Sequence, residues 1–165
     1  MVKKIEAAEF VQISRELPVL DVRSPGEFKQ GHVPGAISFP LFDDTERAEV
    51  GTLYKQVGQV QAVERGLEIV GGKMRGMFAE GLAHAKNGKL MVHCWRGGKR
   101  SESVANLLAV AGLEVYLLNG GYKSYRRWVL EQFLPKQKFL VIGGLTGTGK
   151  TRILHHLGMM GQAIL

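Results

Sequence analysis

The only cysteine of the chain, Cys94, lies in a segment whose residue types favour nucleophilic chemistry. The segment HCWRGGKRS, residues 93–101, holds three cations and two glycines close to the thiol. Nearby cations and a helix N-terminus stabilise a thiolate, and a turn of consecutive backbone N–H groups binds an oxyanion. The segment therefore predicts a nucleophilic Cys94 in an anion-binding loop, with an inert buried cysteine as the alternative. The loop residues expected to bind an anion or substrate are Trp95, Arg96, Gly97, Gly98, Lys99 and Arg100.

The residues on either side of Cys94 each admit two interpretations. His93 is expected to end a strand and to point away from the thiol, because successive strand residues face opposite sides of a sheet. A catalytic partner of the thiol is the alternative role for His93. Trp95 is suited equally to stacking on a base or a lipid and to forming a wall of the pocket.

Short apolar runs that alternate with helical patterns must position this loop. The runs are bounded by Gly, Pro, Asn or Asp, as strands usually are. Strands alternating with helices predict an α/β domain with a largely parallel central sheet flanked by helices. Sites in such folds lie outside the carboxyl ends of the strands, which is where Cys94 is expected. The expected strands are LPVLDV (17–22), GAISFP (35–40), KLMVHC (89–94) and EVYLLNGG (114–121).

The expected helices follow from capping residues and from apolar spacing. Ser24 and Glu27 have the capping-box spacing at the start of a short helix. Apolar residues three and four positions apart predict a long helix that is bent at Gly71–Gly72, with Met74 and Met77 in the core. The expected helices span 24–31, 60–86, 101–111 and 121–133.

A second motif with defined chemistry, GLTGTGKT at 144–151, matches the phosphate-binding pattern G-x-x-x-x-G-K-[ST]. A strand, KFLVIG (138–143), is expected before it and a helix after it, which is the context that the motif requires. The backbone of such a loop cradles phosphates, while Lys150 would reach the terminal ones and Thr151 would hold Mg²⁺. The residues expected to bind phosphate are Gly144, Gly147, Gly149, Lys150 and Thr151.

The two motifs divide the chain into two predicted parts. Residues 1–134 are expected to form the α/β domain, and residues 135–165 a linker with the first strand and helix of a P-loop NTPase-like domain. The chain ends soon after Thr151, before the further strands and the acidic residue that assists the metal in such domains. We therefore expect these 165 residues to be impaired in a complete reaction that needs the P-loop domain.

Composition and charge limit the compartment and the partner. The formal net charge is +7, from 22 basic and 15 acidic residues, which fits either a solvated surface or an anionic partner such as RNA. A single cysteine excludes an internal disulfide framework. No apolar run approaches the roughly 20 residues of a membrane helix, and the N-terminus lacks the pattern of a secretion signal. A reducing cytoplasm without membrane contact is expected, while the oligomeric state stays open.

The segment GGYKSYRRW at 120–128 interleaves cations with aromatic residues, as RNA-binding surfaces do. The alternative is a helix whose aromatic residues face the core and whose cations face water. We favour the core position for Trp128. The cations Lys123, Arg126 and Arg127 fit both interpretations equally.

Three segments together resemble the rhodanese family. They are DVRSPGEFKQGHVPGA (21–36), the cysteine loop CWRGGKRS, and LLNGGYKSYRRWV (117–129). The resemblance covers about residues 5–133. It implies a rhodanese fold in which the loop cysteine, here Cys94, carries sulfur as a persulfide.

The length of the cysteine loop leaves a second reaction open. Cys94 and Arg100 have the spacing Cys-x5-Arg, followed by Ser101, which resembles the signature of cysteine-dependent phosphatases. Arg100 would then clamp phosphate oxygens with two hydrogen bonds. A phosphatase also needs a general acid for the leaving group, for which Asp43 and Asp44 are candidates.

The rhodanese-like segments, the P-loop and DTERAEVGTLYKQVGQ (44–59) together resemble the family of bacterial tRNA 2-selenouridine synthases. This resemblance implies that wobble 2-thiouridine of tRNA becomes 2-selenouridine, with selenophosphate as the selenium donor and Cys94 as the thiol required for that step. It also implies geranyl diphosphate as a second co-substrate, which forms a geranylated nucleoside on the way and whose diphosphate the P-loop would hold instead of a nucleotide. A sulfurtransferase or persulfide carrier, a cysteine phosphatase, and a non-catalytic phosphate- or RNA-binding module are the alternatives.

Overall fold

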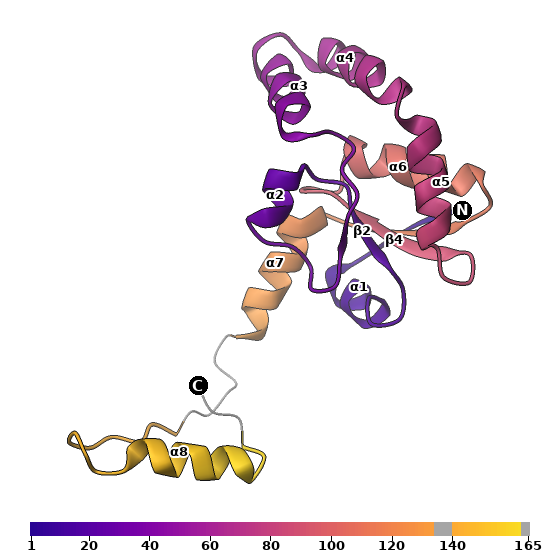
Figure 1. Cartoon of the computed structure of the whole chain (residues 1–165). Helices are drawn as coiled ribbons and strands as arrows, with labels where there is room; N and C mark the ends of the chain where they lie inside the picture. Colours follow the sequence, from indigo (N-terminus) through magenta and orange to yellow (C-terminus); the bar gives the residue numbers. More distant parts are fainter. Residues whose placement is uncertain (134–139, 163–165) are drawn as a thin grey trace. The chain divides into compact units, whose positions relative to one another are not determined.

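A sheet of five parallel strands forms the centre of the N-terminal part of the protein, in the order β1-β5-β4-β2-β3 (Figure 1). The computed structural model describes residues 1–133 and 140–162. The sheet confirms the predicted α/β class, and the helices supply the crossovers that parallel strands need. The strands are β1 Val2–Ile5, β2 Val19–Asp21, β3 Ile37–Ser38, β4 Lys89–His93 and β5 Glu114–Leu118.

The helices include the short capped helix that the sequence predicted. In α2, Pro25–Lys29, the hydroxyl of Ser24 accepts a hydrogen bond from the Glu27 N–H. The Glu27 carboxylate accepts one in return from the Ser24 N–H, so the predicted capping box is confirmed. The other helices are α1 Ala7–Ile13, α3 Asp44–Gln56, α4 Gln59–Gly71, α5 Met74–His84, α6 Lys99–Val110, α7 Gly121–Gln132 and α8 Lys150–Met159.

Side chains alternate along the strands and divide the core between the two faces of the sheet. Leu90 and Val115 point to one face, where α5 and α6 cover them. Met91 and Leu118 point to the other face, where α1 and α7 cover them. Trp128 of α7 is partly buried against this second cluster, as the favoured interpretation of that residue predicts. Both faces of the sheet are therefore covered, as parallel sheets require.

The first strand and helix were not predicted. β1 lies at the edge of the sheet, where it pairs with β5, and of its four residues the structure buries one, Ile5. Its sequence, VKKI, contains two lysines and shows no apolar run. α1 has seven residues, too few to establish a helical period, although Phe10 is fully buried. Both elements depend on packing against the rest of the sheet rather than on local sequence signals.

The long helix predicted across 60–86 is two helices, α4 and α5, with a break at residues 72–73. The Lys73 N–H donates to the Val70 carbonyl at 2.8 Å, which ends α4 instead of only bending it. After the break, α5 turns Met77 into the core and leaves Met74 42% exposed. Placing Met77 in the core was correct, and placing Met74 there was wrong.

The C-terminal part differs from its prediction in one element. The strand predicted at 138–143 is absent from its described residues, 140–143, where Leu140 and Val141 are 87% and 85% exposed. A strand needs a hydrogen-bonded neighbour, and no described segment of this part supplies one. The helix expected after the P-loop is present as α8. Residues 138 and 139 lie outside the described residues.

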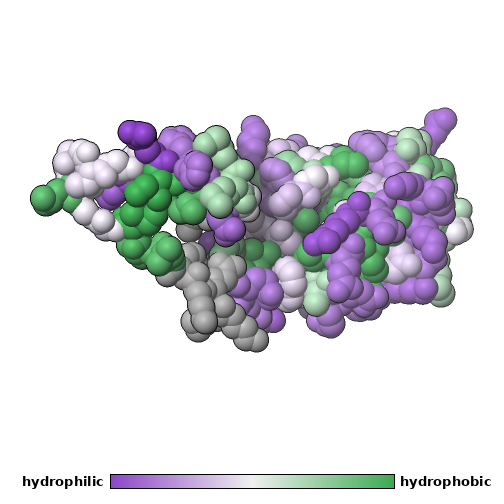
Figure 2. Space-filling model, turned by 90° about the horizontal axis from the view of Figure 1, so that it is seen from below, coloured by the Kyte–Doolittle hydropathy of each residue, from purple (hydrophilic) through white to green (hydrophobic). Residues whose placement is uncertain are grey.

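The chain divides into two compact units, Met1–Gln132 and Phe133–Leu165. The predicted domain boundary between 134 and 135 falls outside the described residues. The surface view in Figure 2 shows hydrophilic and hydrophobic residues intermixed over the unit with the sheet. Across residues 1–133 and 140–162, no helix has the length and apolar character needed to cross a membrane.

Candidate active site

Cys94 directly follows β4 at the carboxyl end of the strand, where the sequence placed it. Its side chain is 3% exposed and belongs to the hydrophobic cluster under α5 and α6. Gly98 is the N-cap of α6, which begins at Lys99. The thiol therefore lies between a strand end and a helix N-terminus, which is the position that the sequence predicted for it.

The loop after Cys94 presents unused hydrogen-bond donors. Across the residues that the structure describes, the backbone N–H groups of residues 96–100 donate to no protein acceptor. The first N–H groups in this region that do find one are those of Ser101 and Glu102, which both donate to the Gly98 carbonyl. Consecutive free N–H groups at a helix start form an oxyanion site.

The hydroxyl of Ser101 completes the surroundings of the sulfur. Ser101 is fully buried, and its Oγ lies 3.1 Å from Cys94 Sγ and 3.0 Å from the Gly98 carbonyl oxygen. A hydroxyl that donates to sulfur stabilises the thiolate, because hydrogen bonds to charged groups are stronger than neutral ones. Sequence reasoning noted Ser101 after the loop but gave it no role. The signal that could have revealed this role is the position of Ser101 two residues into α6, where its side chain faces back toward the end of β4.

Arg100 has a different partner from the one predicted. Its guanidinium donates to both carboxylate oxygens of Glu27, at 2.6 and 3.4 Å, and so joins α6 to α2. Arg47 lies 3.6 Å from the same carboxylate. Burial favours the neutral form of Glu27, but the hydrogen bond and charge of Arg100 outweigh it and hold the pKa of Glu27 below its ordinary value. Arg100 therefore braces the loop here rather than reaching toward a ligand.

The other two predicted cations of the loop are available to a ligand. Arg96 and Lys99 are both exposed. Neither has a carboxylate within 4.0 Å in the described part of the chain. The structure thus separates the three loop cations into one that is committed to an ion pair and two that face solvent.

The start of α7 holds the cysteine loop from outside. The Tyr122 N–H donates to the Cys94 carbonyl at 2.8 Å, and the Lys123 N–H donates to the Trp95 carbonyl at 3.0 Å. Gly121 has a φ of 60° and packs so closely that a Cβ there would overlap the Cys94 carbonyl oxygen. This role of the Gly120–Gly121 turn was missed, because the contact joins segments far apart in sequence.

A buried arginine lies beneath the loop. Arg23 is fully buried and makes a bidentate ion pair with Asp21, with the closest N–O distance 2.6 Å. Its guanidinium carbon lies 4.0 Å from the ring centre of Tyr122 and 5.7 Å from that of Trp95. A cation over aromatic rings is attracted to their faces. Trp95 is half-buried, and its ring centre lies 5.8 Å from that of Tyr122.

His93 ends β4 and is fully buried, as predicted. Its ring lies against Phe10 and Tyr122, on the sheet face opposite the cluster that contains Cys94. Burial lowers the pKa of His93, although Asp21 at 3.7 Å from Nε2 acts in the other direction. The side chain is therefore a neutral packing residue, and it does not reach the thiol.

Neither candidate acid of the phosphatase interpretation is free. The Asp43 carboxylate caps α3 by accepting a hydrogen bond from the Glu46 N–H at 2.7 Å. Asp44 accepts from the Gly26 N–H at 2.8 Å. Hydrogen bonding to Ser24 and to the Gly26 N–H lowers the pKa of Asp44, which disfavours its use as a proton donor.

The P-loop residues form a closed turn at the start of α8. The ammonium group of Lys150 donates to the carbonyl oxygens of Gly144 and Leu145, at 2.9 and 2.7 Å. Gly147 and Gly149 have φ values of 86° and 80°, which a residue with a side chain rarely adopts. Thr151 is exposed. A phosphate bound here would compete with the two carbonyl groups for Lys150. In the described residues there is no group of three or more His, Cys, Asp or Glu that could hold a metal ion.

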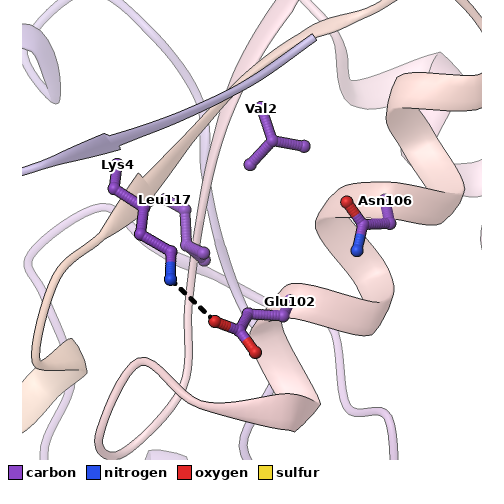
Figure 3. A pocket seen from close by; sticks show the side chains of 5 residues that line it. All are labelled: Val2, Lys4, Glu102, Asn106 and Leu117. Carbon is purple, nitrogen blue, oxygen red and sulfur yellow. Dashed lines mark hydrogen bonds and ion pairs between the residues drawn. The ribbon is translucent and has the colours of Figure 1, made fainter.

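The surface hollows of the structure lie away from the thiol. Among the described residues, one of about 390 Å³ lies between β1 and α6 and contains the ion pair of Lys4 with Glu102 (Figure 3). A second lies between the start of α1 and α7 and is lined in part by Trp128. Neither of these two hollows is lined by Cys94.

Comparison with known proteins gives one family and several relatives. The family model described as Rhodanese-like domain matches residues 6–127. The tRNA 2-selenouridine synthase of Nitrosomonas europaea is 39% identical over 148 residues, which is 86% of this chain and 38% of the relative. That of Pseudomonas putida strain GB-1 is 41% identical over 148 residues, with coverages of 86% and 40%. The chain thus spans about two fifths of the length of these curated relatives.

A solved structure is also similar to this chain. It is the N-terminal domain of a protein from Clostridium difficile 630 that carries the provisional name ATP/GTP binding protein. The two structures agree with a TM-score of 0.66 and 38% sequence identity, over 79% of this chain and 99% of that domain. The similarity supports the arrangement of sheet and helices described above.

The contact between Gly121 and the cysteine loop can be tested with Gly121→Ala. The added Cβ should destabilise the protein more than Gly112→Ala does, because Gly112 has a φ of 83° but open space around it. We expect Gly112→Ala to cost about 1–2 kcal/mol of unfolding free energy, the usual cost of a left-handed non-glycine residue. Gly121→Ala should cost more and should also alter the rate of Cys94 alkylation. Equal costs and unchanged alkylation would show that the turn does not support the loop.

The hydroxyl of Ser101 should raise the reactivity of the thiol. Ser101→Ala should slow the alkylation of Cys94 by iodoacetamide at pH 7 by about tenfold, since a hydrogen bond to a charged group contributes on the order of 1.5–3 kcal/mol. Ser103→Ala, two residues further along α6 and exposed, is the control and should react like the unchanged protein. If both variants react at the same rate, the Ser101 hydroxyl serves only the Gly98 carbonyl.

The Glu27–Arg100 ion pair predicts a pH-dependent stability. Because the folded-state pKa of Glu27 is lowered, its contribution is present above the unfolded value near 4.5 and is lost as the pH falls through the folded value. Glu27→Gln should cost up to about 1 kcal/mol at pH 7, by urea unfolding, and progressively less below pH 4.5. Glu131→Gln, at an exposed carboxylate of α7, should change little at any pH. A cost for Glu27→Gln that does not vary with pH would assign the effect to packing.

Proposed function

The chain belongs to the rhodanese-like domain family, and we propose that it carries the thiol-bearing domain of an enzyme that converts wobble 2-thiouridine of tRNA to 2-selenouridine. One observation carries the proposal. Relatives about 40% identical over 86% of this chain are named tRNA 2-selenouridine synthase. A reactive thiol at an oxyanion site is suited to a reagent that brings its selenium on a phosphate.

In this proposal Cys94 is the active-site thiol of the selenium step. The free N–H groups of residues 96–100 bind the phosphate part of selenophosphate, which is an anion small enough for a narrow loop. Arg96 and Lys99 add positive charge from the solvent side. Ser101 donates its hydrogen bond to the sulfur whenever Cys94 carries negative charge. The remaining loop residues, Trp95, Gly97, Gly98 and Arg100, shape and brace the site.

The P-loop takes the second phosphate-bearing co-substrate in the same proposal. Geranyl diphosphate supplies the alkyl group for the geranylated intermediate, and its diphosphate suits a turn of Gly144, Gly147 and Gly149 that ends at Lys150. The Lys150 ammonium would exchange its two carbonyl partners for phosphate oxygens. Mg²⁺ would neutralise the diphosphate, with the exposed Thr151 hydroxyl as the ligand from this chain.

Because the proposed partner is tRNA, we also propose a cytoplasmic location. tRNA modification would take place in the cytoplasm, where Cys94 stays a free thiol because thiols are kept reduced there. The net charge of +7 favours a polyanionic partner.

A stand-alone sulfurtransferase is the second candidate, and membership in the rhodanese-like family favours it. Cys94 would then carry sulfur as a persulfide and pass it to an acceptor. Transfer of sulfur from thiosulfate to cyanide would measure this activity. A Cys-x5-Arg phosphatase has less support, because Arg100 is held by Glu27 and Asp44 is held as a hydrogen-bond acceptor. Hydrolysis of an aryl phosphate that is lost in Cys94→Ser would restore that candidate.

The proposed function can be tested with a chimera, because the chain spans two fifths of its relatives. Residues 1–133 of this chain would replace the matching domain of the Nitrosomonas europaea relative, so that every other part of the longer protein is present. The chimera is mixed with 2-thiouridine tRNA, geranyl diphosphate and selenophosphate. We expect selenium in the wobble nucleoside, measured by mass spectrometry after digestion of the tRNA. Cys94→Ser in the chimera should abolish it.

Two controls make the result decisive. Ser103→Ala in the chimera should leave the selenium yield unchanged, since this side chain is exposed and away from the sulfur. Thermal unfolding of each chimera shows that it is folded. A folded chimera that transfers sulfur from thiosulfate but puts no selenium into tRNA would replace the proposed function with the sulfurtransferase.

A further inference from the structure

We propose that the exposed cations of α7 and of the cysteine loop form one strip that binds the phosphate backbone of RNA beside the thiol. The strip consists of Arg96 and Lys99 in the loop and Lys123, Arg126 and Arg127 on α7. The proposal rests on the proposed function and deepens it, because it assigns the path by which a tRNA reaches Cys94. The three α7 cations are not part of the site described above.

The strip comes from two stretches of chain without acidic residues. Residues 90–101 contain no Asp or Glu, and neither do residues 115–130. The first stretch surrounds the cysteine loop, and the second covers β5 and most of α7. Each of the two stretches carries three Lys or Arg residues, whereas the other acid-free stretches of this unit that hold a cation, such as 28–42, 50–63 and 69–79, carry one or two. The fold therefore brings together the two stretches with the most unopposed positive charge.

The cations of the strip are largely unpaired. In residues 1–133 and 140–162, Lys99, Lys123 and Arg126 have no carboxylate within 4.0 Å, and the same holds for Arg96. Arg127 lies 4.0 Å from Glu131, in a pair whose side chains are 75% and 55% exposed. Exposed pairs of this kind are weak. The positive charge of the strip is therefore largely not neutralised by carboxylates of the described residues and can attract an anionic partner.

Backbone hydrogen bonds connect the two halves of the strip. The Lys123 N–H donates to the Trp95 carbonyl, so the first cation of α7 lies next to the cysteine loop. Lys123 and Arg126 or Arg127 are three and four residues apart and share one face of the helix. The cations thus follow α7 away from the thiol at intervals of about one helical turn, 5.4 Å.

The two faces of α7 have separate tasks. Tyr122, Tyr125 and Trp128 pack against the second core cluster, while Lys123, Arg126 and Arg127 are exposed. The first N–H groups of α7 are occupied by the Cys94 and Trp95 carbonyls, so the positive side chains, not the helix terminus, attract the anion. The aromatic face of α7 therefore packs in the core, and only the charged face is exposed to bind a partner.

The shape of the strip favours a polynucleotide over a membrane. A nucleic acid offers a phosphate at each nucleotide of a narrow chain, which suits cations on successive turns that lead to a narrow loop. Binding through phosphates alone is not sequence-specific, so the strip would position tRNA while the loop acts on the nucleoside. Anionic vesicles serve as the competing partner in the test.

The test compares two triple variants of the whole chain. Lys123→Gln, Arg126→Gln and Arg127→Gln remove the α7 part of the strip. Lys29→Gln, Lys55→Gln and Arg75→Gln form the control set. These three control residues are also exposed, with no carboxylate within 4.0 Å in the part of the chain that the structure describes, and their removal lowers the net charge equally. Binding of a fluorescein-labelled, in vitro transcribed tRNA is measured by anisotropy between 50 and 300 mM KCl, and Cys94 alkylation checks the loop.

We expect the strip variant to bind tRNA at least about tenfold more weakly than the control set, with the slope of log Kd against log salt reduced by about 2. Alkylation of Cys94 should be unchanged in both. If the control set weakens binding as much, net charge alone explains it and the proposal fails. Tight tRNA binding that the strip variant retains would also overturn the strip but would leave the proposed function standing.

Two further outcomes separate the possible partners. An unchanged chain that binds no tRNA at 50 mM KCl would overturn both the strip and the proposed function. Binding to vesicles with one third anionic lipid, lost in the strip variant and without any tRNA binding, would assign the strip to a membrane surface instead.

Discussion

The structure depends on one close approach between two backbone segments, the cysteine loop and the turn that begins α7. The carbonyl groups of Cys94 and Trp95 accept hydrogen bonds from the first N–H groups of α7. With its carbonyls held on that side, the loop keeps the N–H groups of residues 96–100 unpaired. Gly97 and Gly121 make the approach possible, because a Cβ on Gly97 would lie 2.7 Å from the Leu118 carbonyl oxygen and one on Gly121 would overlap the Cys94 carbonyl. The unpaired N–H groups that we propose as an oxyanion site thus depend on a contact outside the loop.

Electrostatics beneath the loop reinforce this contact. Burying the Arg23 guanidinium is costly unless it is paired, and the Asp21 carboxylate and the Gly31 carbonyl supply partners. Its Nη1 has no hydrogen-bond acceptor in the described residues, but the guanidinium lies over the Tyr122 ring. Tyr122 is also the residue whose N–H holds the Cys94 carbonyl. The buried cation therefore fixes the aromatic residue that positions the thiol loop.

The sequence was sufficient for features whose signals are local. The strand before Cys94, the capping box at Ser24 and Glu27, and the helix after the loop all follow from residues adjacent in sequence. The Glu27–Arg100 pair was not predictable, because 73 residues separate its members and any of the three loop cations could have formed the ion pair. The sequence indicated a bend at Gly71–Gly72, but it did not indicate that α4 ends there or that Met74 is exposed, since the direction of a helix after a break is set by packing. The prediction of a strand at 138–143 was wrong over its described residues, because an apolar sequence alone does not supply a neighbouring strand to pair with.

The combination of sulfur and phosphate signals in one loop has a physical explanation. A thiolate and an oxyanion are stabilised by the same groups, which are free N–H donors, a helix start and positive charge. A phosphatase uses its loop arginine on the ligand, whereas here Arg100 is bound to Glu27 and the backbone N–H groups of residues 96–100 are the donors without a protein acceptor in the described residues. Such a loop is suited to a small anion that brings its own leaving group. It also leaves Arg96 and Lys99 outside, where a larger polyanion can be held without entering the site. In the proposed function, this division of charge between the Arg100 ion pair and the exposed Arg96 and Lys99 would let one thiol loop serve a small phosphate-bearing donor and a nucleic acid at the same time.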